Sequence, residues 1–220
     1  SQYLNVSGYN NTSIGYLSMF SNTSGFRNTG LGNQALTNNT TGNLNTAVGS
    51  FALGNNTTGA TNVGVGFNAL TLNSSGYSNV AVGSGALEIN TIESNIVAIG
   101  DSALHFYNGT NGSTPALFGN NTAVGSKALF SSSTGTSNSA LGSQALYSND
   151  NGNFNVAVGG KSLFANTSGS GNVAIGVNSI QQNTTGVANI GIGRGALYGG
   201  PNGTGNYNIA IGNNSLLANT

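Results

Sequence analysis

The chain has 220 residues, of which 36 are glycine, four are basic, four are acidic and none is cysteine. A net charge of zero excludes the electrostatic attraction on which nucleic-acid binding depends, and the lack of cysteine excludes disulfides and thiolate metal sites. No run of 18 apolar residues occurs, so we expect no direct insertion into a membrane.

A repeat of 17 residues runs through the chain. Each unit carries a small residue, an aliphatic residue and then a glycine, and these glycines are Gly15, Gly32, Gly49, Gly66, Gly83, Gly100, Gly125, Gly142, Gly159, Gly176, Gly193 and Gly212. A fixed period of this length is the signature of a repeat fold in which each unit packs only on its neighbours. We therefore predict an all-β protein, a left-handed parallel β-roll or β-solenoid of twelve 17-residue coils.

A strand is expected to lead into this glycine, which we number position 0. Position −1 is Val, Ile or Leu, position −3 is β-branched or Ser, and position −2 is Ala, Gly or Ser, as in residues 46–48. Alternate residues of a strand share a face, so one face is aliphatic and the other is nearly bare. We expect the aliphatic face to line the inside of the coil. The bare face, which permits close approach, is then expected to lie against neighbouring chains.

The positions that follow the glycine are also regular. Position +3 is Ala or Ser, and position +4 is Leu in ten units. The tail Asn-Thr-Thr-Gly at 183–186 predicts a turn in which Gly186 has positive φ and Asn183 bonds its own backbone. Burying one Leu and one Val contributes about 3–6 kcal/mol. Ordering 17 backbone units costs roughly 17–34 kcal/mol, so a coil depends on its neighbours. We predict a parallel homotrimer; the alternative is a monomer whose small face narrows the coil.

Two steps of the repeat are longer than 17 residues. Gly100 to Gly125 spans 25 residues, which places an eight-residue insertion at about 105–117, and a smaller bulge lies at 199–203. Insertions in solenoids protrude and often lie on the binding face, where aromatic side chains can stack on sugars or anchor a protein. Packing of the aromatics within the loop itself is the alternative. The candidate ligand loop contains His105, Phe106, Tyr107, Asn108, Pro115 and Phe118.

Aromatic residues also recur at position +5. In a rod, residues at one position form a line along the axis, so this stripe is expected either to seal the trimer seams or to bind glycans. The candidate stripe contains Phe20, Phe130, Tyr147, Phe164 and Tyr198.

The sequence holds no catalytic constellation. His105 is the only histidine, so we expect no metal site within one chain, no cofactor and no enzymatic activity. The acids are scattered, and each is expected to be a solvated surface charge: Glu88, Glu93, Asp101 and Asp150. Asn-X-Ser/Thr sequons could carry glycans in a glycosylating host, although a chain of this composition produces them by chance; examples begin at Asn22, Asn56, Asn166 and Asn183.

The motif Asn-Thr-Ala-Val-Gly at 45–49 and its variants at 172–176 and 208–212 resemble the head repeats of trimeric autotransporter adhesins. The longer unit, with its Ala-Leu and Asn-Thr-Thr-Gly segments, is similar to repeats of bacteriophage tail fibres and related bacterial fibre proteins. The resemblance covers the whole chain, although adhesin heads usually have shorter units. It implies a homotrimeric extracellular fibre, on a cell surface or a virion, that meets a glycan or protein receptor.

We therefore expect residues 1–220 to form a single repeat domain and to be a piece of a longer fibre protein, because the pattern continues to both ends. The leading hypothesis is a structural, non-catalytic shaft or head segment of an adhesin or tail fibre, which acts by multivalent weak contacts. One alternative is a self-assembling surface filament, because open solenoid ends leave strand edges unpaired. Another is an ice-binding protein, because threonine pairs such as residues 57–58 recur in the turns.

Overall fold

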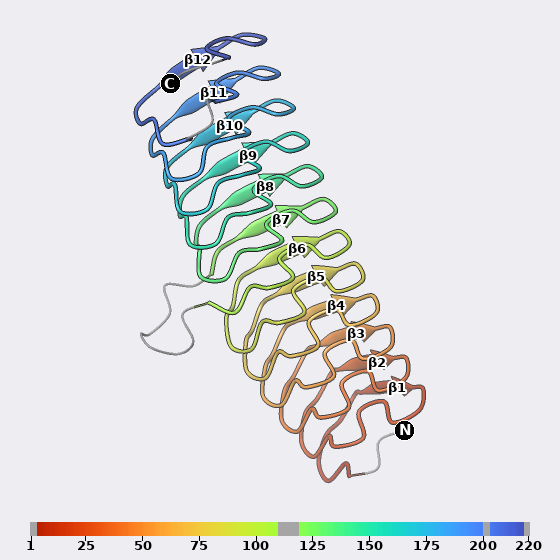
Figure 1. The fold of residues 1–220 in the computed structure, drawn as a ribbon. Helices are drawn as coiled ribbons and strands as arrows, with labels where there is room; N and C mark the ends of the chain where they lie inside the picture. The colour runs from red at the N-terminus through yellow and green to blue at the C-terminus, as the bar shows by residue number, and fades with distance from the viewer. Residues whose placement is uncertain (1–3, 110–118, 200–202, 218–220) are drawn as a thin grey trace.

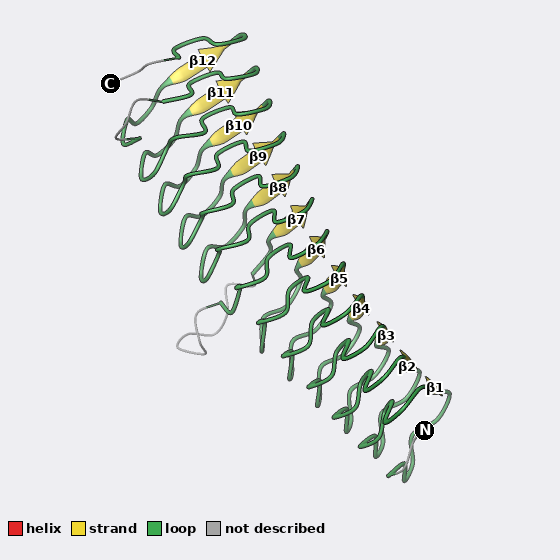
Figure 2. Ribbon diagram, turned by 45° about the vertical axis from the view of Figure 1, so that its right-hand side comes forward, coloured by secondary structure: helices red, strands yellow, loops and turns green. Residues whose placement is uncertain are grey.

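The computed structural model describes residues 4–109, 119–199 and 203–217. It confirms an all-β solenoid with about eleven turns, roughly 17 residues per coil and a single parallel sheet along one side (Figure 1). The strands in this part of the chain are β1 (Thr12–Ile14), β2 (Thr29–Leu31), β3 (Thr46–Val48), β4 (Val63–Val65), β5 (Val80–Val82), β6 (Val97–Ile99), β7 (Thr122–Val124), β8 (Ser139–Leu141), β9 (Val156–Val158), β10 (Val173–Ile175), β11 (Ile190–Ile192) and β12 (Ile209–Ile211). Turns and loops form the rest of each described coil (Figure 2).

The strands pair in sequence order, and equal repeat positions lie side by side. Thr46 of β3 pairs with Val63 of β4, as the 17-residue period requires. The pairing is the same across the insertion, where Val97 of β6 pairs with Thr122 of β7. The extra residues therefore leave the register of the sheet unchanged.

The strand faces point the opposite way from the sequence prediction. In β2 to β12 the middle residue, Ala or Gly, is buried, and its two aliphatic or hydroxyl neighbours are partly or largely exposed. The bare face therefore lines the inside of the coil, and the expectation that it contacts neighbouring chains was wrong. The reason is space: a Cβ added at Gly64 would lie only 3.3 Å from the Leu53 side chain. The coil is narrow enough that little more than Cβ fits beneath the strand.

Positions +3 and +4 supply the apolar interior. The residues at +4 adopt positive φ, for example 51° at Leu53 and 56° at Leu70, which costs an L-residue roughly 1–2 kcal/mol. Bonds between coils hold this conformation, as where Leu53 N donates to Ala69 O at 3.0 Å. The fully buried side chains at +4 include Met19, Leu36, Leu53, Leu70, Leu87, Leu104, Leu129, Leu146 and Leu163.

Two columns of asparagine provide the polar half of the interior. At position +7, Asn56 Nδ2 donates to Asn39 Oδ1 of the previous coil at 2.8 Å and to Gly59 O of its own turn at 2.9 Å. At position −4, Asn62 N donates to Asn45 Oδ1 at 3.0 Å. We call these columns the Asn ladders, and the turn from +7 to −4 the Asn corner. Local bonding of asparagine to its own turn, as predicted for Asn183, is confirmed at 3.0 Å.

The ladders also explain the sequons. Their asparagines are buried, and each Nδ2 donates to oxygens inside the coil, so these side chains are not accessible for glycosylation: Asn22, Asn56, Asn166 and Asn183.

Glycine recurs at two positions of the coil, 0 and +10, for different reasons. Gly49 at position 0 has φ of 130°, which L-residues rarely adopt, and a Cβ there would overlap the Gly66 carbonyl. The prediction of positive φ at Gly186, at position +10, was wrong, because its φ lies outside that region. This glycine is needed for space instead, since a Cβ would overlap the Asn183 side-chain oxygen.

Candidate functional site

Four consecutive coils place a ring at position +5. His105 stacks on Phe130 with ring centroids 5.6 Å apart, Phe130 on Tyr147 at 5.2 Å, and Tyr147 on Phe164 at 5.1 Å. The rings are within 12° of parallel, because in-register coils superpose equal positions. Stacking between coils of one chain is therefore what joins these side chains, and we call this group the aromatic stack.

The geometry of the aromatic stack limits what it can bind. Ring faces that lie against one another are not open to the flat face of a sugar, and the half-buried rings present mainly edges. The predicted stripe is not continuous. Gln181 separates Phe164 from Tyr198, and Thr71 and Glu88 occupy the same position on the other side of His105. Phe20 and Tyr198 therefore share the repeat position of the stack but lie apart from it.

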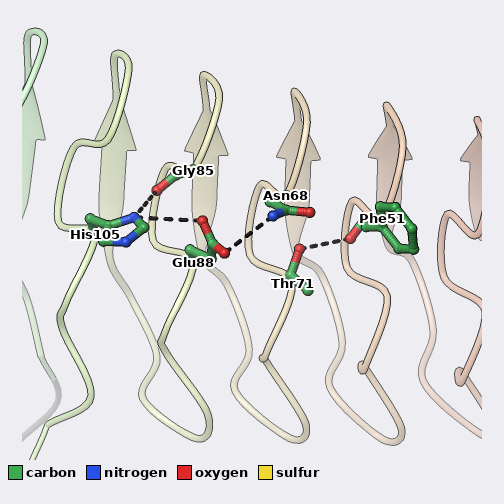
Figure 3. Close-up of polar contacts among 6 residues, drawn as sticks. All are labelled: Phe51, Asn68, Thr71, Gly85, Glu88 and His105. Atoms are coloured by element: carbon green, nitrogen blue, oxygen red, sulfur yellow. Dashed lines mark hydrogen bonds and ion pairs between the residues drawn. The ribbon is translucent and has the colours of Figure 1, made fainter.

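A polar cluster lies at the N-terminal end of the stack (Figure 3). His105 Nδ1 donates to Gly85 O at 3.1 Å and lies 3.6 Å from Glu88 Oε2. Glu88 Oε1 accepts a bond from Asn68 Nδ2 at 3.2 Å, and Thr71 Oγ1 donates to a backbone oxygen of the previous coil. Each contact joins neighbouring coils, so the first effect of the cluster is to link coils along the rod.

The first residues of the predicted ligand loop follow the regular repeat. His105 to Asn108 occupy positions +5 to +8 of an ordinary coil, whereas Pro115 and Phe118 lie outside the described residues. Phe106 is 48% exposed and its ring is nearly perpendicular to His105 and Phe130. Asn108 accepts a bond from Thr91 Oγ1 at 2.7 Å. Of the described residues of this loop, Phe106 is thus the one that presents an aromatic surface to solvent.

Tyr107 is buried rather than displayed. Its side chain occupies the place of a ladder asparagine and is fully inaccessible. Burial raises the pKa of the Tyr107 hydroxyl well above its usual range, and the Glu93 carboxylate adds to this rise. Glu93 itself is only 3% exposed, so its prediction as a solvated surface charge was wrong. Glu93 stands at position +10, where most coils have glycine, for example Gly59 and Gly76.

The sequence prediction assigned to the interior a strip of residues that the structure leaves accessible. Positions −3 and −1 of the sheet form two outward columns of Val, Ile, Leu, Thr and Ser, which we call the outer face. Leu141 is 52% exposed and Ile211 is 69% exposed, and the inner strands contribute half-buried valines such as Val80 and Val82. No charged residue occurs in these columns. The alternation that defines the outer face was visible in the sequence, but its direction was not.

Little else in the described part of the chain offers chemistry. No group of three or more His, Asp or Glu side chains comes together there to hold a metal ion. A hollow of about 300 Å³ between the last coils is lined by Arg194, Tyr198 and Leu217 with backbone and amide groups, and it contains no carboxylate or histidine. No helix long and apolar enough to cross a membrane is present among these residues.

The chain matches no protein-family model, no curated protein and no solved structure. The assignment of function therefore depends on the geometry described above.

Proposed function

We propose that the chain is a structural, non-catalytic segment of an extracellular fibre, on a cell surface or a virion, in which three parallel copies pack through the outer face. The observation that supports this proposal is the outer face, an uncharged apolar strip that runs along the sheet from β1 to β12.

The size of the outer face favours a partner. Twelve strands spaced by about 4.8 Å give a length of roughly 53 Å, and two outward side chains per strand give a strip about 10 Å wide. The resulting footprint of roughly 500 Å² is as large as the largest apolar patch of a typical monomer, and such patches are often functional. Covering it removes apolar area from water along the whole rod.

A second and third copy of the same chain suit this surface better than an unrelated partner. Identical rods repeat their side chains at the same spacing, so parallel copies remain in register from one end to the other. The absence of charge on the outer face means that copies related by rotational symmetry bring no like charges together. The resemblance of the repeats to trimeric fibre proteins selects three copies over two.

In this proposal the receptor contacts are made by surfaces outside the trimer seam. Among the described residues of the candidate loop, Phe106 is the exposed aromatic one, and it would be repeated in each copy. Three copies of a weak contact to a glycan or protein receptor raise the overall affinity through multivalency.

One observation favours a fibre over an ice-binding protein. The threonine hydroxyls at position +8 are already used as donors within the coil stack, as where Thr40 Oγ1 donates to Thr57 O at 3.0 Å. A similar bond runs from Thr57 Oγ1 to Ser74 O. These hydroxyls are therefore not a free, regular array facing water.

The test is the mass of the protein in solution, measured by sedimentation equilibrium or light scattering. Val80→Lys places a charge in the middle of the outer face, and Thr58→Lys places the same charge on an exposed turn as the matched control. We expect a trimer for the native chain and for Thr58→Lys, and a monomer for Val80→Lys, because burying three ammonium groups is costly. A native monomer or a trimeric Val80→Lys variant would refute packing through the outer face.

A further inference from the structure

The residues at positions +2 and +5 form two columns that lie beside each other along the rod. Asn68 Nδ2, at +2, donates to Glu88 Oε1, at +5 of the next coil, at 3.2 Å (Figure 3). Lys161, at +2, has its Nζ 5.9 Å from the centre of the Phe164 ring, at +5 of the same coil. We call the surface formed by positions +1, +2 and +5 the lateral face.

The hollow of about 300 Å³ belongs to the lateral face. The described residues that line it all stand at +1, +2 or +5 of three successive coils, and they are Asn178, Arg194, Gly195, Tyr198, Asn214 and Leu217. Its volume is at the lower end of the range of small-molecule pockets, roughly 300–1,000 Å³. A ligand about as large as one or two sugar rings therefore fits it.

Gly195 leaves the middle of the hollow without a side chain. In the +2 column Asn178 precedes this glycine and Asn214 follows it. The φ angles are alike, 57° at Asn178, 62° at Gly195 and 54° at Asn214, so the backbone at this position accepts asparagine and does not require glycine. A Cβ at Gly195 would lie 2.5 Å from Asn214 Oδ1, at the end of a side chain that lines the hollow. The glycine therefore provides space rather than a special conformation.

The groups around the hollow have the chemistry that recognises an acidic sugar. Arg194 is exposed and forms no ion pair in the described chain. The side-chain amides of Asn178 and Asn214 form no hydrogen bond there, and the Tyr198 ring, unlike that of Tyr147, is not stacked on another ring. A guanidinium pairs with a carboxylate through two parallel bonds, amides bond hydroxyls, and an aromatic ring packs on the apolar face of a sugar.

The charges of the lateral face favour an anionic ligand. From residue 125 onward the cations are Lys127, Lys161 and Arg194, all on this face, and none of them forms an ion pair in the described chain. Each is two coils from the next, which is about 9.6 Å at the spacing of about 4.8 Å between strands. The one acid in this part, Asp150, stands at +8, where it accepts a bond from Ser133. A DNA strand carries a phosphate about every 3.4 Å, so a glycan with more widely spaced acidic groups fits this row better.

We infer that the hollow at Arg194 binds a sugar ring that bears a carboxylate, as part of a glycan that extends along the lateral face toward Lys161. Arg194 pairs with the carboxylate, and Tyr198 packs against the ring. Asn178 and Asn214 bond its hydroxyls. Such a glycan is the receptor in the proposed function, on whose receptor-binding role the inference rests; the trimer is not needed, because all these residues belong to one chain.

Binding is measured on the full chain by saturation-transfer NMR. The acidic probes are trigalacturonate and sialyllactose, and the matched neutral probes are the methyl ester of the first and lactose. We expect the native chain to bind at least one acidic probe about tenfold or more tightly than its neutral counterpart. Arg194→Gln should weaken that binding at least about tenfold, because it removes the charged pair. Arg27→Gln, at the other exposed arginine, is the matched control and should bind like the native chain.

Gly195→Asn tests the space itself, because it fills the hollow with the residue of the adjacent coils and removes no binding group. We expect an unchanged melting temperature and at least about tenfold weaker binding of the acidic probe. Undiminished binding by Arg194→Gln or Gly195→Asn, or no binding of either acidic probe by the native chain, would overturn the inference. Equally tight binding of a single-stranded oligodeoxythymidylate would overturn it too, since it would indicate a general attraction of anions. A monomer that binds the acidic probe refutes only the trimer, and a trimer that does not bind it refutes only this site.

Discussion

The Asn ladders lead to a sharp prediction for Asn56. Its Nδ2 donates to Asn39 Oδ1 and Gly59 O, and its Oδ1 accepts a bond from Asn73 Nδ2. Asn56→Ala removes three bonds worth about 1 kcal/mol each, and it leaves Asn39 Oδ1 buried without a donor at a further cost of about 1–3 kcal/mol. Gly59 O keeps the bond from Asn45. We expect the free energy of unfolding to fall by about 4–6 kcal/mol.

The assay is urea denaturation followed by circular dichroism at one fixed protein concentration, because any association makes the apparent stability concentration-dependent. Asn55→Ala is the matched control. Asn55 is the adjacent residue of the same type, but it is exposed and accepts one surface bond from Asn38. We expect its substitution to cost less than about 0.5 kcal/mol. If the two variants differ by less than about 1 kcal/mol, the ladder does not stabilise the coil as argued.

Three further predictions concern the interior. Leu70→Ala, at a fully buried site, should cost about 3–5 kcal/mol, whereas Leu72→Ala, at an exposed site of the same coil, should cost under about 1 kcal/mol in the same denaturation assay. Gly59→Ala should lower the melting temperature, at a cost of about 1–3 kcal/mol, because its Cβ overlaps backbone and ladder atoms; retention of the native melting temperature would contradict this. Tyr107→Phe removes an unpartnered buried hydroxyl and should leave stability unchanged or raise it by about 1 kcal/mol. Since the folded state raises the pKa of Tyr107, its unfolded form ionises first; the native chain should therefore lose stability above about pH 10 relative to Tyr107→Phe, and parallel pH profiles would refute this.

The sequence was sufficient for the period, the strand positions and the register, because in-register stacking forces residues 17 apart to coincide. It could not decide which strand face points inward. Alternation specifies two faces, and the choice depends on how much of the interior the leucine at +4 and the ladder asparagines already fill. The space left beneath the strand is known only once the cross-section of the folded coil is known.

The insertion was misplaced for a related reason. The 25-residue step gives its length but not its position, and the aromatic run starting at His105 looked irregular. The signal was present in Ala103 and Leu104, which are the usual residues at +3 and +4 and place His105 at +5. Numbering Glu93 in the same way places it at position +10, which is glycine in most coils. A position-by-position alignment of the units would have found both features.

The interior of the coil is complete without the outward residues, so the apolar character of the outer face needs a separate explanation. The coil interior is already filled by Ala, Leu and Asn, and most of its polar atoms are satisfied within the chain. The outward residues at −3 and −1 contribute little to that interior, so a solitary rod would remain folded with threonine or lysine there. Threonine does occupy some of these places, but Val and Ile fill most of the others, including both outward positions of β5 and β11. Under the trimer proposal, these aliphatic residues are covered by the other two copies, and Val80→Lys tests that condition.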